Sequence, residues 1–225
     1  MTRPPCLLVL DLDGTLVDSV DDLAACANRM LDRRALPPIT AAELRPMIGD
    51  GLQALVERIL ISRGARPDGR AVSAYMADYD AHAADASRLF PGIDAMLRQA
   101  LATGWRLAVC TNKPVRPARA LLDALGIGTL FAAIGGGDSF ASRKPDPAHL
   151  LGTIALAHGQ PELSVMVGDH RNDIAAARGA GIPGIFADWG YGGTDMQLGA
   201  AAIAAEPQDV LPAAIRLLEA TRAER

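Results

Sequence analysis

Residues 7–15 read LLVLDLDGT, and this stretch decides the fold. Leu7–Leu10 is a continuous apolar run, which is typical of a parallel strand covered on both faces. The run stops at Asp11 and Asp13, and Gly14 permits the sharp turn that follows. Alternate residues of an extended chain point the same way, so two converging carboxylates need a cation or a shared proton. The stretch predicts a buried strand with an acidic loop at its carboxyl end.

Similar short apolar runs recur along the chain, and each stops at a polar or glycine-rich cluster. These runs are 107–110, 132–134, 165–167 and 184–187, with helical patterns at 93–103, 116–125, 148–158 and 173–180 between them. Alternating strands and helices predict an α/β fold, a doubly wound, Rossmann-like parallel sheet with right-handed crossovers. In such sheets the ligand site lies at the carboxyl ends of the strands.

The segment 18–88 breaks this alternation, because it contains only helical patterns. We predict an inserted all-helical cap domain at 18–88 and a catalytic core formed by 1–17 together with 89–225. Ser19 is expected to begin the first cap helix as a capping residue.

Composition narrows the class of partner. The chain has 225 residues, 50% of them apolar, and a formal net charge of −4, which allows one good core and a small satellite. An acidic balance argues against nucleic acid and anionic membranes as partners. The sequence shows neither a signal peptide nor an apolar run of membrane-spanning length, and its three cysteines are far apart. We therefore expect a cytoplasmic protein, a monomer or homodimer, that acts on a small molecule.

Three further polar clusters follow the later predicted strands. Thr111 and Asn112 follow the second strand, Lys144 follows the third, and Asp169 and Asp173 follow the fourth. Taken singly, they read as a loop hydroxyl, a surface charge and helix caps. Their joint placement at one edge of the sheet favours a common site.

These residue types supply what phosphoryl transfer needs. Asp11 can attack phosphorus, and oxygen ligands from Asp11, Asp13 and Asp169 can hold Mg²⁺. Lys144 and the Thr111 hydroxyl can bind the remaining phosphoryl oxygens. Asp13 can protonate the leaving alkoxide and later activate the water that cleaves the acyl phosphate.

The sequence resembles the haloacid dehalogenase superfamily, in its phosphatase branch with a helical cap after the first motif. The family's four motifs are matched by Asp11, Asp13, Gly14 and Thr15, by Thr111, by Lys144 before Pro145, and by Gly168, Asp169 and Asp173. The resemblance implies that Asp11 is the nucleophile and that Asp13 is the acid and base and lends a backbone carbonyl to Mg²⁺. It further implies that Asp169 completes the metal site and that Asp173 orients Lys144 or a metal-bound water.

Within the family, the wording at 11–19, 111–114 and 168–173 is closest to phosphoglycolate phosphatases, so 2-phosphoglycolate is the predicted substrate. One departure is His170, where such phosphatases usually carry a small hydroxyl residue. One hypothesis is that His170 lies beside the metal and adds a pH dependence near neutrality, and the alternative is a tolerated substitution near the rim.

Contacts to the substrate are predicted from both parts of the chain. Thr15 and Asn112 are candidates in the core, and Arg45 and Gly49 are candidates in the cap, where Arg45 can pair with a carboxylate. An exposed helix charge explains Arg45 equally well. Tyr79 and its helical neighbours fit a substrate wall, but ordinary core packing is favoured.

Other functions remain open at this stage. The same groups serve a phosphatase of another small ester or sugar phosphate, or a phosphosugar mutase that returns the phosphoryl group to its substrate. A phospho-accepting receiver module is the non-enzymatic alternative, although its acceptor Asp follows the third strand, where glycines stand here. A dehalogenase has no use for the acid Asp13, because a halide leaves without a proton.

Overall fold

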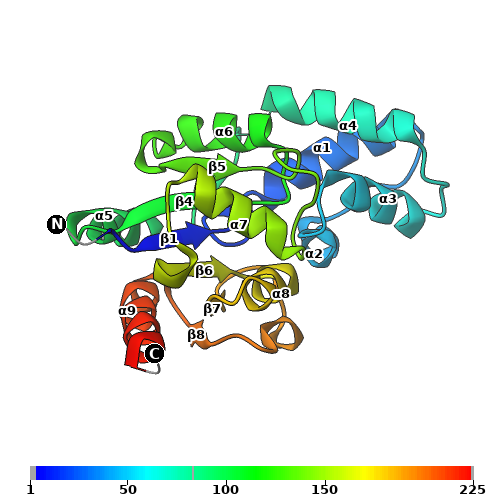
Figure 1. Cartoon of the computed structure of the whole chain (residues 1–225). Helices are drawn as coiled ribbons and strands as arrows, with labels where there is room; N and C mark the ends of the chain where they lie inside the picture. Colours follow the sequence, from blue (N-terminus) through cyan, green and yellow to red (C-terminus); the bar gives the residue numbers. More distant parts are fainter. Residues whose placement is uncertain (1–3, 83, 224–225) are drawn as a thin grey trace.

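The computed structural model describes residues 4–82 and 84–223. A six-stranded sheet in the order β5-β4-β1-β6-β7-β8 forms the centre of the larger part of the molecule (Figure 1). Its neighbouring strands all pair in parallel. The strands are β1 (Leu7–Leu10), β4 (Arg106–Cys110), β5 (Ala133–Gly135), β6 (Ser164–Gly168), β7 (Gly184–Ala187) and β8 (Ala202–Ala204). The predicted α/β fold with a parallel sheet is confirmed.

The strand order changes direction at β1. After β1 the chain adds β4 and β5 on one side, and then crosses to add β6, β7 and β8 on the other. The loops after β1, β4 and β6 therefore diverge around a crevice at the carboxyl edge of the sheet, where open α/β sheets bind ligands.

Helices cover both faces of the sheet, because successive strand residues point to opposite faces. Leu8 and Leu10 pack into a cluster with α5 (Ile93–Ala102), α6 (Val115–Ala124) and α9 (Val210–Ala223). Leu7 and Val9 pack on the other face with α7 (Pro147–Leu156) and α8 (Arg171–Gly179). These four strand residues are fully buried, which explains the unbroken apolar run in the sequence.

Within the described residues, four α-helices stand between the short strands β2 (Val17–Asp18) and β3 (Arg88–Leu89), and they lie at the end of the molecule drawn at the right of Figure 1. They are α1 (Val20–Asp32), α2 (Ala41–Leu44), α3 (Leu52–Ser62) and α4 (Gly69–His82), and we call them the cap helices. They share their own hydrophobic cluster. A two-stranded antiparallel ribbon, β2 with β3, joins them to the core. The predicted domain boundaries at 17–18 and 88–89 fall in this ribbon and stay a prediction.

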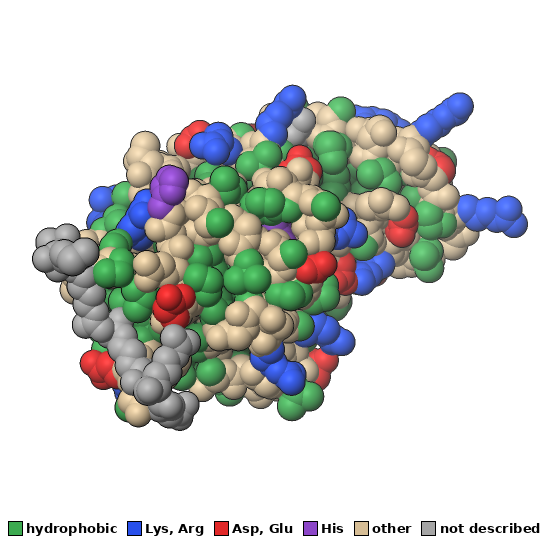
Figure 2. All heavy atoms as spheres, in the orientation of Figure 1, with side chains coloured by type: hydrophobic (Ala, Val, Ile, Leu, Met, Phe, Trp, Pro, Cys, Tyr) green, Lys and Arg blue, Asp and Glu red, His purple; other side chains and the backbone are tan. Residues whose placement is uncertain are grey.

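One face of the molecule carries side chains of both charges. Figure 2 shows one face, on which basic and acidic side chains are interspersed among apolar ones. No helix within residues 4–82 and 84–223 combines the length and the apolar character needed to cross a membrane.

Candidate active site

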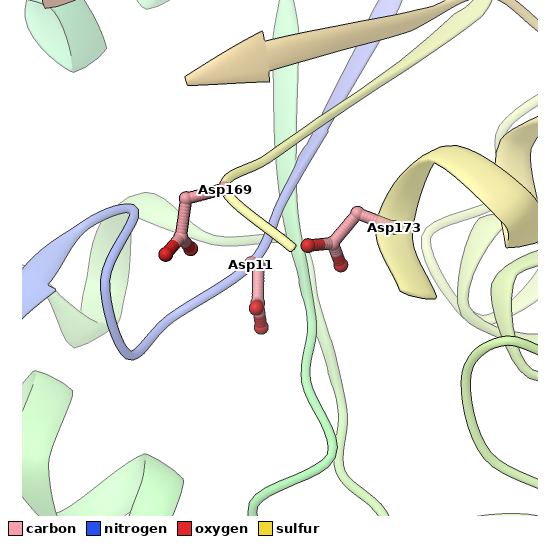
Figure 3. Close-up of side chains that lie close together, drawn as sticks. All are labelled: Asp11, Asp169 and Asp173. Atoms are coloured by element: carbon pink, nitrogen blue, oxygen red, sulfur yellow. The ribbon is translucent and has the colours of Figure 1, made fainter. Parts of the chain in front are cut away.

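The predicted site residues lie at the carboxyl edge of the sheet. Asp11 directly follows β1, Thr111 directly follows β4, and Asp169 directly follows β6, while Asp173 stands in the first turn of α8. Figure 3 shows Asp11, Asp169 and Asp173 converging from these separate elements. One oxygen from each carboxylate lies within 4.8 Å of the others. The crevice thus holds three buried acidic groups.

Lys144 stands between two of these carboxylates. Its Nζ lies 2.8 Å from Oδ1 of Asp11 and 2.5 Å from Oδ1 of Asp173, and its side chain is 1% exposed. Burial lowers the pKa of Lys144, but the charges of Asp11 and Asp173 outweigh it and hold that pKa above its ordinary value. Lys144 is therefore a fixed ammonium beside the predicted nucleophile.

Asp169 is held on both of its carboxylate oxygens. The Thr15 hydroxyl donates to Oδ1 at 2.8 Å, and the backbone amides of Tyr191 and Gly192 donate to Oδ2 at 2.8 and 3.3 Å. Thr15 is completely buried and also accepts from the amide of Asp169 at 3.1 Å. In this structure Thr15 supports Asp169, and its predicted contact with substrate stays a prediction.

The acidic cluster has the character of a cation site. Burial and the charge of Asp11 raise the pKa of Asp169 to about 6, and burial raises that of Asp173 although Lys144 opposes the shift. When all three buried carboxylates are ionised, the single ammonium of Lys144 leaves two of their negative charges uncompensated. Carboxylate oxygens are the ligands that hard divalent cations prefer, so the residues present fit such an ion.

Close approach of the surrounding loops depends on glycine. A Cβ added at Gly14 would lie 2.3 Å from Oδ2 of Asp169, and one added at Gly190 would lie 2.2 Å from the Cβ of Asp169. Gly14 also has a φ of +87°, in the left-handed region that L side chains avoid. The glycine of the first motif is thus required by both conformation and space.

Asp13 is paired with Lys113, a residue to which the sequence analysis gave no role. Both of its carboxylate oxygens accept from Nζ of Lys113 at 2.8 Å, and Oδ1 also accepts from the Ser19 hydroxyl at 2.6 Å. Its side chain does not belong to the carboxylate cluster of Asp11, Asp169 and Asp173 found among the described residues. The metal contact predicted for its backbone carbonyl stays a prediction.

The prediction that Ser19 caps α1 through its side chain is wrong, because its hydroxyl is used by Asp13. The Tyr191 hydroxyl takes that place: it accepts from the amides of Ser19 and Val20 at 2.7 and 3.0 Å and donates to Asp18 at 2.9 Å. Sequence reasoning gave no role to Lys113 or to the side chain of Tyr191. The signal for Lys113 was its position next to Asn112, whereas nothing local marks Tyr191.

The cap approaches the core through the loop that contains Gly49. The backbone carbonyl of Gly49 accepts hydrogen bonds from the side-chain amides of Asn112 and Asn172, at 2.9 and 3.3 Å. Asn112 also donates to the carbonyl of Lys144 at 2.9 Å, so its amide connects the cap loop to the Lys144 loop. A Cβ added at Gly49 would lie 2.6 Å from Cδ2 of His170. The predicted substrate roles of Gly49 and Asn112 stay predictions.

Two cavities open between the cap helices and the core. We call the first the main cavity; its lining includes Asp11, Asp13, Gly49, Tyr79, Thr111 and Lys113. The second is smaller, and Asp13, Arg45, Asp169, His170 and Tyr191 contribute to its lining.

Arg45 and Tyr79 border different cavities. The guanidinium of Arg45 is exposed and lies 5.8 Å from the ring centroid of Tyr191, in the small cavity. Tyr79 belongs to the hydrophobic cluster of the cap and also lines the main cavity. Core packing and a place in the cavity wall therefore both apply to Tyr79.

His170 lines the small cavity and begins α8. Its Nδ1 accepts from the amide of Asn172 at 3.2 Å, which leaves the proton of the neutral ring on Nε2, and burial lowers its pKa. A lowered pKa keeps the ring neutral at pH 7 and confines its protonation to more acidic solutions.

We therefore expect His170→Ser to leave the shape of the kcat/KM profile unchanged between pH 7 and 9. Loss of an inflection in that range from the variant would contradict this assignment.

Comparison with known proteins gives a consistent result. The family model described as haloacid dehalogenase-like hydrolase matches residues 8–187. A phosphoglycolate phosphatase of Cereibacter sphaeroides is 42% identical over 179 residues, which cover 78% of this chain and 81% of the relative. One from Caulobacter vibrioides is 38% identical over 216 residues, which cover 94% and 91%.

A solved structure extends the likeness to three dimensions. The crystal structure of a predicted phosphoglycolate phosphatase from Haemophilus somnus superposes with a TM-score of 0.84 at 30% identity, covering 92% of this chain and 97% of that one. The similarity therefore includes both the sheet and the inserted helices.

Proposed function

The chain belongs to the haloacid dehalogenase-like hydrolase family, and from this membership we propose that it is a Mg²⁺-dependent phosphomonoesterase that hydrolyses 2-phosphoglycolate. One observation carries the proposal: Asp11 lies at the topological switch point of the sheet, with the Lys144 ammonium on one oxygen and Asp169 within reach. A nucleophile, a fixed cation and a cation site stand together there.

Each step of the proposed reaction is assigned to one side chain of the site. A carboxylate oxygen of Asp11 bonds to phosphorus while the bond from phosphorus to the ester oxygen breaks. Asp13 gives its proton to the departing alkoxide, which leaves as glycolate. Asp13 then takes a proton from water, whose oxygen attacks the phosphorus of the aspartyl phosphate and releases inorganic phosphate and Asp11. The Lys144 ammonium stabilises the negative charge of the phosphoryl oxygens during both steps.

The residues that would hold Mg²⁺ are Asp11 and Asp169, with Asp173 close by and the backbone carbonyl of Asp13 as a further ligand. Bound there, the ion supplies positive charge that neutralises the phosphoryl oxygens. Thr15 and the amides of Tyr191 and Gly192 orient Asp169 for this task.

Mg²⁺ is expected to stabilise the protein more at pH 7.5 than at pH 5. Folding raises the pKa of Asp169 from about 3.9 to about 6, so this group favours the folded state below about pH 4 and loses that contribution as the pH rises through 6. Mg²⁺ compensates the carboxylate that is ionised at pH 7.5. The measurement is the unfolding temperature with Mg²⁺ and with chelator at both pH values, and Asp169→Asn should remove the difference between pH values. If Mg²⁺ raised the unfolding temperature equally at both pH values, the assignment of Asp169 to the Mg²⁺ site would be contradicted.

The substrate is supported by the relatives, since phosphoglycolate phosphatases with 38–42% identity cover most of this chain. The test is release of inorganic phosphate with Mg²⁺ from 2-phosphoglycolate, sugar phosphates and nucleotides. We expect kcat/KM to be highest for 2-phosphoglycolate. Preference for a sugar phosphate would keep the mechanism and replace the substrate. Conversion of sugar phosphates without phosphate release would identify a mutase and overturn the proposal.

A further inference from the structure

Lys113 is a buried ammonium in the main cavity that the proposed mechanism does not use. Among the described residues that line this cavity, it is the one basic side chain. Its side chain is 6% exposed, and its Nζ lies 4.4 Å from the ring centroid of Tyr79. The other ammonium of the site, Lys144, is already committed between Asp11 and Asp173. Lys113 is therefore a second cation of the site, separate from the one that serves the phosphoryl group, and it is the one that lines the main cavity.

We propose that Lys113 binds the carboxylate of the substrate and thereby determines the preference for a carboxylate-bearing phosphomonoester. This inference rests on the proposed function, because it assigns one further contact within the same site. The contact identifies the carboxylate as the feature of the substrate that the main cavity recognises. The core motifs alone do not identify that feature.

The position of Lys113 relative to the acid supports this contact. Asp13 must touch the ester oxygen in order to protonate it, and both oxygens of Asp13 lie 2.8 Å from Nζ of Lys113. In 2-phosphoglycolate one methylene group separates the ester oxygen from the carboxylate carbon, which places the two atoms about 2.4 Å apart. An ammonium that touches the acid therefore lies within hydrogen-bond reach of the substrate carboxylate.

Lys113 also has a donor to spare. An ammonium carries three N–H groups, and the two oxygens of Asp13 account for two of them. The ring of Tyr79 holds the ammonium in place by a cation–π contact. A substrate carboxylate can accept from the third N–H group without displacing Asp13.

The part of the cavity wall that the cap contributes favours the same charge. Gly51 and Leu52 line the cavity where α3 begins, and that helix has no side-chain cap on its first amides. The N-terminus of an 11-residue helix presents partial positive charge and free N–H groups. A carboxylate between Lys113 and α3 would thus meet positive charge from both the core and the cap.

The burial of Lys113 gives this contact its effect on rate. Its side chain is 6% exposed, so a substrate carboxylate that accepts from the ammonium is paired largely away from water. A neutral group of the same shape forms a weaker hydrogen bond there, so the contact raises kcat/KM for substrates that carry a carboxylate.

Arg45 is the competing candidate for the carboxylate, and its location argues against it. Its guanidinium lies over Tyr191 in the small cavity, whereas Asp11 and Lys113 line the main cavity. Because Lys113 and Arg45 border different cavities, substituting each one separately shows which of them binds the substrate carboxylate.

The test compares 2-phosphoglycolate with acetol phosphate, in which a methyl ketone replaces the carboxylate at nearly constant shape. The readout is kcat/KM for 2-phosphoglycolate divided by kcat/KM for acetol phosphate. General damage to the catalytic groups lowers both values equally and therefore does not change this ratio. We expect Lys113→Met to lower this ratio about 100-fold and Lys113→Arg to retain most of it. Arg45→Met should leave the ratio within about threefold.

The outcomes separate the two proposals. A ratio unchanged in Lys113→Met, or lost in Arg45→Met instead, would overturn the assignment of Lys113 while the phosphatase function stands. A wild-type protein that releases phosphate from no ester would instead overturn the proposed function. An increase in unfolding temperature on adding Mg²⁺ and inorganic phosphate shows that the Met variant is folded with its phosphoryl site intact. If that variant does not fold, Lys113→Gln provides the same comparison.

Discussion

Asp11→Asn is expected to abolish phosphate release, with a fall in kcat of at least about 10⁴-fold, because an amide cannot form the acyl phosphate. The protein should remain folded. In the presence of chelator its unfolding temperature should equal or exceed that of the wild type, since the change removes one of three buried carboxylates that lie close together and repel one another. Steady-state kinetics and thermal unfolding measure the two effects.

Asp94→Asn is the matched control for this change. Asp94 forms an exposed pair with Arg98 on α5, so its substitution should leave both kcat and the unfolding temperature close to wild type. Residual activity of Asp11→Asn above about 1% of wild type, with contamination and deamidation excluded, would show that Asp11 is not the nucleophile.

Lys144→Met is expected to eliminate activity and to destabilise the fold by about 3–5 kcal/mol at neutral pH without Mg²⁺, because it leaves Asp11 and Asp173 buried without a counter-charge. The loss should shrink as the pH falls, since folding already raises the pKa values of Asp169 and Asp173 and these groups then become neutral. Chemical denaturation at pH 5 and 7.5 measures the free energy of unfolding.

A double variant separates charge from packing in this result. Lys144→Met combined with Asp173→Asn removes one charge of each sign, so it should recover more than half of the lost stability but none of the activity. If the double variant is no more stable than Lys144→Met alone, the loss arises from packing and the proposed charge balance is wrong.

The sequence was sufficient for the arrangement of the core, and the reason is physical. Strands buried on both faces read as unbroken apolar runs, and three of the four sequence motifs stand directly after such a run: Asp11 after β1, Thr111 after β4 and Asp169 after β6. β8 was missed because Ala202–Ala204 is a three-residue strand at the edge of the sheet, with Ile203 exposed. Its pattern resembles that of a loop.

Contacts between distant loops could not be predicted in this way. Asp13 and Lys113 are 100 residues apart, and Ser19 and Tyr191 are separated by 172. Their meeting depends on how the cap helices lie against the core, which no local pattern records. The same reason explains why Thr15, a motif residue, supports Asp169 through its hydroxyl. Sequence identifies which groups gather at the edge, whereas the structure shows which of them touch.

Tyr191 links two parts of the molecule that have to work together. Its amide holds Asp169, and its hydroxyl holds the first residues of α1 next to the β2–β3 ribbon. If the cap helices rotate about this ribbon in the proposed reaction, the hydroxyl contacts of Tyr191 will be the first to change. We therefore expect a movement of the cap to be transmitted through this one residue to the carboxylate of Asp169.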